Sequence, residues 1–217
     1  MENLTKRYWK LRLERCKDAL TTNNFDVFLA DDSFHAREII FKKIVPKINP
    51  KTVSWGDSMT LYSTGVLDVF KQDPEIRVIE TFDDTLPRPE IIERRREALL
   101  ADLFFTGSNA VTETGTLVNL DMVGNRVAGI IFGPEHVVIT AGRNKIVSDL
   151  HDAMERIKGY AAPVNAVRHH IKTPCAKTSD CMDCGSPDRI CNTWSIAEKS
   201  FPKGRIRVVL INKDLGL

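Results

Sequence analysis

The chain has 217 residues and a mass of 24.5 kDa, with 42% hydrophobic and 28% charged residues. This composition is typical of a globular protein and excludes a disordered chain. The 31 basic residues nearly balance the 29 acidic ones, so the net charge of +2 gives no reason to expect nucleic acid as a partner. No apolar run is long enough to cross a bilayer, and the first residues lack the apolar segment of a signal peptide, so we expect a cytoplasmic protein without a membrane span.

The first half of the chain alternates amphipathic helices with short apolar strands. Apolar residues recur at helical spacing over the first twenty residues. Further strands are predicted at 25–30, 52–55, 77–80 and 101–105, and further helices at 33–44, 64–71 and 90–100. This alternation is typical of an α/β protein, and we expect an open mixed, mostly parallel sheet flanked by helices.

The pattern changes after residue 109. Three apolar runs, at 116–121, 127–132 and 137–140, follow one another without an evident helix between them. Because Gly124-Asn125 suits a hairpin, we expect antiparallel strands here and then a helix over 144–158. The sequence predicts a single α/β domain over 1–217, in which 161–204 is an excursion that returns to the sheet through a final strand at 205–212.

Four cysteines lie close together in this excursion, with the spacing C-x5-C-x2-C-x6-C. They are Cys175, Cys181, Cys184 and Cys191. Four thiolates can hold a tetrahedral Zn²⁺ or anchor an iron–sulfur cluster. A structural zinc site more often has two Cys-x-x-Cys pairs, and this segment has one, which favours a cluster and leaves zinc as the alternative. The missing signal peptide argues against two disulfides, and the polar segment argues against four inert buried thiols.

Three loops near strand ends expose small polar residues, where an open α/β sheet binds ligands. Glycine lets a backbone approach a ligand, hydroxyl and amide groups offer hydrogen bonds, and helix N-termini favour an anionic group. Ordinary strand-to-helix turns explain the same residues, so a small anionic ligand is a hypothesis. The candidate ligand-binding residues are Gly56, Asp57, Ser58, Thr60, Gly107, Ser108, Asn109, Thr112, Thr114 and Gly115.

Glu113 lies in the third of these loops, directly before an apolar strand. A partly buried carboxylate there can serve as a nucleophile or a general base, so Glu113 is the candidate catalytic residue. The alternative is that Glu113 accepts hydrogen bonds from neighbouring hydroxyls and amides and holds the turn. Residue types by themselves favour this second interpretation.

Ser108–Asn119, Asn125–Gly129 and Pro134–Gly142 together resemble the LUD (lactate-utilisation) domain family, and the resemblance covers nearly the whole chain. Thr173–Asn192 looks like a cysteine tail that a subset of these proteins carries. The resemblance implies a fold like that of CoA transferases and ribose-5-phosphate isomerase, with Glu113 as the nearest analogue of the transferases' nucleophilic glutamate. It also implies a role in oxidising lactate to pyruvate with partner subunits that carry further iron–sulfur clusters.

Three hypotheses about function remain open at this point. The first is a component of a 2-hydroxy-acid (lactate) oxidation system with a four-cysteine metal or iron–sulfur centre. The second is a stand-alone CoA-transferase-like enzyme that uses Glu113 on an acyl or sugar-phosphate substrate. The third is a regulatory module that binds a small ligand and contains a structural zinc.

Overall fold

The computed structural model describes residues 4–217, so the first three residues of the predicted N-terminal helix lie outside the described part. The strands of the larger sheet, sheet A, are β1 (Asp26–Ala30), β2 (Thr52–Trp55), β3 (Arg77–Ile79), β4 (Leu103–Gly107), β7 (His136–Gly142) and β10 (Ile206–Ile211). Those of sheet B are β5 (Ala110–Thr112), β6 (Leu117–Asp121), β8 (Ile146–Val147) and β9 (Thr193–Ala197).

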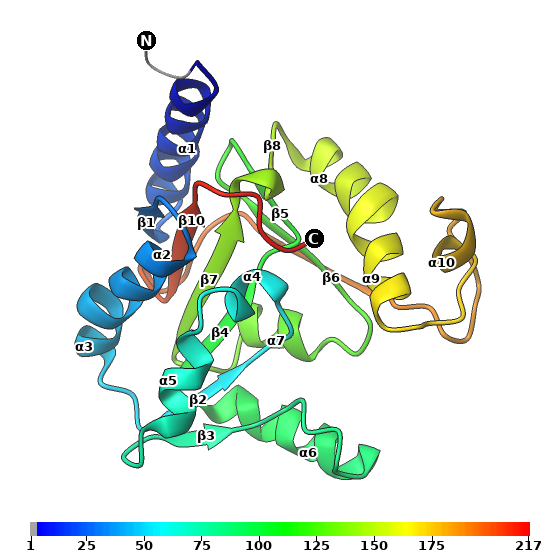
Figure 1. Cartoon of the computed structure of the whole chain (residues 1–217), viewed down its shortest axis with the longest axis horizontal. Helices are drawn as coiled ribbons and strands as arrows, with labels where there is room; N and C mark the ends of the chain where they lie inside the picture. The colour runs from blue at the N-terminus through cyan, green and yellow to red at the C-terminus, as the bar shows by residue number, and fades with distance from the viewer. Residues whose placement is uncertain (1–3) are drawn as a thin grey trace.

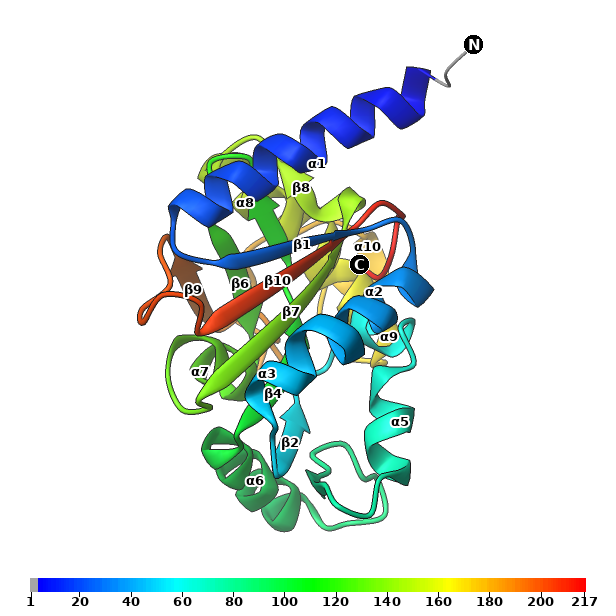
Figure 2. The same cartoon turned by 90° about the vertical axis from the view of Figure 1, so that its left-hand side faces the viewer.

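Sheet A has the strand order β1-β10-β7-β4-β2-β3, and each neighbouring pair in it is parallel. Sheet B has the order β8-β5-β6-β9, in which β6 is antiparallel to both of its neighbours. Figure 2 shows β1, β10 and β7 side by side, with α1 (Leu4–Thr22) running beside β1, the edge strand. The predicted fold class, a mostly parallel open sheet flanked by helices, is confirmed.

Helices and sheet B cover both faces of sheet A. One face packs against α2 (Ser33–Ile39), which continues through a π-helical turn (Ile40–Ile44) into α3 (Val45–Ile48), and against α4 (Met59–Tyr62) and α5 (Val66–Gln72). The other face packs against α1, the turn Ala98–Leu100 that follows α6 (Arg88–Glu97), α7 (Asn125–Ile131) and sheet B. Outside sheet B, α8 (Leu150–Arg156) continues through the turn Ile157–Ala161 into α9 (Ala162–Arg168), and α10 (Cys175–Thr178) follows. None of the helices within residues 4–217 is both long and apolar enough to span a membrane.

The central strands supply both hydrophobic cores because successive side chains of a strand point to opposite faces. In β7, Val137 and Ile139 belong to the core under α1 and sheet B, whereas Val138 belongs to the core under α2–α5. Phe104 and Phe105 of β4 divide in the same way. Burial on both faces explains why these strands are continuous apolar runs without a polar alternation.

The predicted strand at 127–132 is wrong, because α7 occupies these residues. Gly124 begins the helix with a positive φ of 92°, so it does not form a hairpin. The carboxylate of Asp121, at the end of β6, accepts the N–H of Val127 at 3.0 Å and thereby satisfies an amide in the first turn of the helix. The apolar run and Gly124-Asn125 suggested a strand after a hairpin, but a contact made by the preceding strand stabilises a helix.

Two further predictions about the second half also need correction. The strand predicted at 137–140 is β7, which pairs in parallel with β10 and β4 inside sheet A. Antiparallel pairing is confined to sheet B, where it includes a strand that was not predicted, β9, from within the excursion. The helix predicted at 144–158 begins at Leu150, because a 3₁₀ turn (Arg143–Lys145) and β8 precede it.

Candidate functional site

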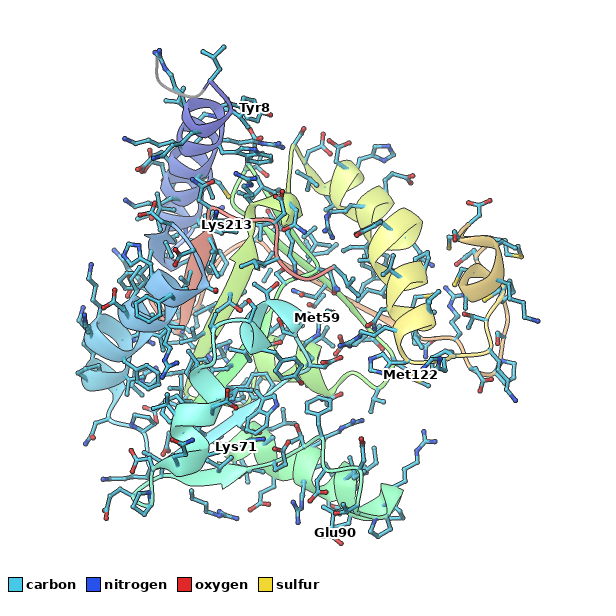
Figure 3. The ribbon with its side chains drawn as sticks, viewed as in Figure 1. Tyr8, Met59, Lys71, Glu90, Met122 and Lys213 are labelled. Carbon is cyan, nitrogen blue, oxygen red and sulfur yellow. The ribbon has the colours of Figure 1, made fainter. Side chains whose placement is uncertain are left out.

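A cleft of about 440 Å³ lies at the carboxyl ends of β2 and β4. Its other walls are the end of β6, the start of α7, the turn after β7, and α9. Figure 3 labels two of the wall residues, Met59 at the start of α4 and Met122 in the loop after β6. The cleft therefore occupies the place where an open α/β sheet is expected to bind ligands.

Half of the predicted ligand-binding residues line this cleft: Asp57, Ser58, Gly107, Ser108 and Asn109. Gly56 lies directly behind them, and a Cβ built on it would come within 2.8 Å of Cγ of Arg126. Thr60 is not part of the lining, and its hydroxyl donates to the carbonyl oxygen of Leu215 at 3.0 Å. The two strand-end loops after β2 and β4 thus meet at one cleft, and their role in ligand binding stays a prediction.

Several of these residues build the wall of the cleft. The Asp57 carboxylate forms an ion pair with Arg168 and lies 3.3 Å from Nε2 of His169, which ties the loop after β2 to α9. Oγ of Ser58 accepts the N–H of Leu61 at 3.2 Å and caps α4. Oγ of Ser108 donates to the carbonyl oxygen of Ala110 at 2.8 Å.

Arg126, which the sequence reasoning missed, joins three elements at the floor of the cleft. Its Nε donates to the Asp121 carboxylate at 2.9 Å, its Nη1 to Oδ1 of Asn119 at 2.7 Å, and its Nη2 to Oδ1 of Asn109 at 2.6 Å. The side chains of Arg126 and Asp121 are 10% and 9% exposed, so this is a buried ion pair. A planar guanidinium with many fixed donors is suited to such a site. It was missed because the following residues were predicted to form a strand.

Two other basic residues of the cleft, Lys145 and Arg95, form no ion pair among residues 4–217. Lys145, in the turn after β7, is 5% exposed and makes no hydrogen bond or ion pair there. Burial, and then the charges of Arg156 and Arg126, lower the pKa of Lys145 to about 7. Arg95 lies with its Cζ 5.3 Å from the centre of the Phe82 ring, and its buried Nε has no hydrogen-bond partner. A guanidinium with an unused donor suits an anionic ligand.

Lys145 could have been found in the sequence. It follows the predicted strand at 137–140, and the strand-end rule that selected the loops after β2 and β4 applies to it equally. The rule was not applied there because that strand was expected to be antiparallel, outside the parallel sheet.

The third predicted loop lies outside the cleft. Thr112, Thr114 and Gly115 form the turn between β5 and β6, in which the hydroxyls of Thr112 and Thr114 are 2.7 Å apart. Gly115 has a φ of 86°, and a Cβ there would come within 2.6 Å of the carbonyl carbon of Ala19 in α1. This turn therefore packs against the N-terminal helix.

Glu113 belongs to the same turn and is likewise absent from the cleft lining. Its carboxylate forms an ion pair with Arg12 and a second with Arg15 at 3.1 Å, both from α1. Its backbone N–H donates to the carbonyl oxygen of Val147 at 2.8 Å. The carboxylate thus pairs with arginines of α1 instead of the neighbouring hydroxyls and amides that the structural interpretation expected. The catalytic role of Glu113 stays a prediction.

The four clustered cysteines line one small pocket of about 20 Å³ beside α9. They are half-buried free thiols, and Nζ of Lys158 lies 3.8 Å from Sγ of Cys191. No group of three or more His, Cys, Asp or Glu side chains within residues 4–217 is arranged around a position for a single metal ion. Cys16 lies apart in α1, where burial raises the pKa of its thiol to about 12.

The cysteine pocket and the cleft share a wall. Ile190 lines both of them. Helix α9 and the turn before it contribute Ala161 and Asn165 to the cleft and Ala162 and Pro163 to the cysteine pocket. Figure 1 shows α9 between the strands and α10, which begins at Cys175.

The fold and the cleft define an α/β protein with a candidate ligand site at the carboxyl edge of a parallel sheet. The LUD domain family matches residues 13–211, so the chain belongs to the LUD domain family. The crystal structure of a DUF162 family protein from Deinococcus radiodurans has a similar fold, with a TM-score of 0.51 and 12% identity over 94% of this chain and 97% of that one. No curated protein matches the chain.

Proposed function

We propose that the protein is a component of a 2-hydroxy-acid (lactate) oxidation system, in which the cleft binds a small anionic acid and the four cysteines hold a redox centre. Membership of the LUD domain family supports this class of function. Arg95 supports an anionic ligand, because it lines the cleft and its buried Nε has no hydrogen-bond partner among residues 4–217.

The main observation behind this proposal is that the cleft and the cysteine pocket share a wall. A centre held by Cys175, Cys181, Cys184 and Cys191 would be separated from a ligand in the cleft by Ile190 and α9. Electrons from an oxidised ligand would therefore have a short path to the centre. Partner subunits would supply the remaining steps of the oxidation.

The cysteines suit a cluster or a zinc ion by their chemistry, since all four residues line one pocket. Lys158 and Arg189 also line this pocket, and positive charge favours the thiolate form that binds metal. An iron–sulfur cluster takes its ligands from a wider polyhedron than a single ion does, and this segment has one Cys-x-x-Cys pair where a structural zinc site more often has two. We therefore propose an iron–sulfur cluster first and zinc second.

Anaerobic purification tests the centre. We expect visible absorption with stoichiometric iron and sulfide, and loss of both in Cys181→Ser and in Cys184→Ser. Cys16→Ala is the matched control, because Cys16 is buried in α1 away from the pocket, and it should retain the cluster. A colourless protein with about one zinc per chain would exclude the cluster and support a structural zinc.

Reconstitution tests the reaction. We expect lactate-dependent reduction of an electron acceptor only when the partner subunits are present, and its loss when this chain carries Cys184→Ser. Turnover by the isolated chain that Glu113→Gln abolishes would contradict the proposal and favour a CoA-transferase-like enzyme. The ion pairs of Glu113 with α1 give that alternative no support.

A further inference from the structure

Lys145 is a buried lysine that lines the cleft. It lies at the end of β7, the strand between β10 and β4, and its residue is 5% exposed. A Cβ built on Gly216 would lie 3.4 Å from its Nζ, so the last residues of the chain pack against one side of the amine. Among residues 4–217 it has no hydrogen-bond acceptor or carboxylate. A protonated ammonium in this position is therefore poorly solvated.

The charged groups around Lys145 do not compensate for this. Arg156, from α8, directs its donors to the carbonyl oxygens of Asn144 and Asn109. Arg126, from α7, forms an ion pair with the carboxylate of Asp121, so this carboxylate is not available to Lys145. On the side of α9, the carboxylate of Asp57 interacts with Arg168 and His169.

These surroundings favour the neutral amine. Two guanidiniums act on Lys145, the nearby carboxylates are engaged elsewhere, and burial removes water. A desolvated lysine beside other cations is a pattern by which proteins obtain a nucleophilic amine at neutral pH.

We propose that Lys145 is the nucleophile of the cleft and condenses with the carbonyl carbon of a small 2-oxo acid to form an imine. The inference rests on the proposed function for its substrate class, because oxidation of a 2-hydroxy acid yields a 2-oxo acid. Nζ attacks the carbonyl carbon, a C–N bond forms, and the carbonyl electron pair moves to oxygen. Transfer of both amine protons to that oxygen releases it as water, so amine plus ketone gives imine plus water without an oxidant.

Reductive trapping tests the inference on the full chain. Pyruvate is added with sodium cyanoborohydride near neutral pH, and the modified lysines are located by peptide mass mapping. We expect an adduct at Lys145 with the mass of pyruvate less one oxygen atom. An amine with a pKa of about 7 has on the order of 10³-fold more free base at neutral pH than one of ordinary pKa, so Lys145 should be labelled first.

The variant Lys145→Arg and the exposed lysines of the same chain serve as the two controls. Lys145→Arg keeps a positive charge but forms no imine, so its adduct should disappear while the exposed lysines keep their slow background labelling. Adducts spread evenly over exposed lysines, or no adduct at all, would overturn the inference. The wild-type mass map alone gives this answer, even if the variant does not fold.

Lactate separates this inference from the ligand site itself, because it has the same carboxylate as pyruvate and no carbonyl. If lactate raises the melting temperature and pyruvate gives no adduct at Lys145, the imine is excluded and the anionic ligand site stands. If neither acid changes the melting temperature and no adduct forms, the cleft is not the site of these acids and both proposals fail.

Discussion

At the scale of the residue, the cleft contains two buried cations in opposite situations. Arg126 directs its donors to Asp121, Asn119, Asn109 and backbone carbonyls, whereas Lys145 has none of these partners. Burying a charge is costly unless the charge is paired and hydrogen-bonded. The Arg126 network therefore stabilises the folded state, whereas a charged Lys145 amine destabilises it. A destabilising ionisable group at the edge of a cleft is typical of a functional residue.

The burial of the Lys145 amine predicts how the stability of the folded protein depends on pH. The pKa of Lys145 falls from its ordinary 10.5 to about 7 on folding, so between these values the unfolded chain binds a proton that the folded chain does not. Stability therefore rises with pH across this window and is lost as pH falls through it. We expect Lys145→Met to be more stable than the wild type near neutral pH by a few kcal/mol, with the difference shrinking towards about pH 10.

Urea unfolding at a series of pH values across this window measures the effect. Lys213→Met removes a lysine charge at an exposed position and serves as the control. A stability difference for Lys145→Met that stays constant across the window would mean that Lys145 keeps an ordinary pKa in the folded protein.

At the scale of the element, α1 is attached to sheet B through the β5–β6 turn. Arg12 and Arg15 pair with Glu113, and Gly115 brings the turn against the backbone of Ala19. The helix buries Leu13, Cys16 and Leu20, which face the turn and the sheet. The hydroxyl-rich turn that resembled a ligand loop is thus a docking point for a helix.

Two glycines provide a matched test of this contact. Gly115 and Gly124 both have a positive φ, but a Cβ at Gly124 has nothing within 4 Å, whereas one at Gly115 meets the backbone of α1 at 2.6 Å. We expect Gly124→Ala to cost about 1 kcal/mol through backbone strain and Gly115→Ala at least twice as much. Chemical denaturation measures the costs, and limited proteolysis reports release of α1. Equal costs for the two variants would show that the turn does not support the helix.

At the scale of the whole molecule, the two ends of the chain meet inside one sheet. β10, from the C-terminal part, lies between β1, from the N-terminal part, and β7. Its pairing extends from Asp26↔Arg207 to Ala30↔Ile211 on one side and along β7 on the other. Without β10, the strand β1 has no partner in sheet A.

A chain that ends at Gly204 is therefore expected to show no cooperative thermal transition. A chain that ends at Asn212 is the control, because it keeps β10 and loses the contacts of residues 213–217, which include those of Asp214 with Arg143 and of Leu215 with Thr60. The control should unfold cooperatively at a lower melting temperature. Circular dichroism and calorimetry measure both, and a cooperative transition in the shorter chain would mean that β1, β7 and β4 form a stable sheet without β10.

The local pattern predicted much of the fold. The strands at 52–55 and the C-terminal strand, and the helix over the first twenty residues, lie where their periodicity indicated. The run at 127–132 was misread because an apolar run after Gly124-Asn125 suggests a strand after a hairpin, while Asp121 and Gly124 favour a helix only once β6 and the turn are in place. β9 was missed because its pairing partner, β6, lies far away in the sequence.

Local spacing in the amino-acid sequence was enough to predict the fold class, the family, the clustering of the four cysteines and the strand-end loops after β2 and β4. The folded structure then settles which polar residues share a site. It placed Arg126 and Lys145 in the cleft, turned Glu113 towards α1, and put the cysteine pocket on the other side of Ile190 from the cleft. Burial and charge pairing depend on contacts between distant segments, and these exist only after the sheets have packed.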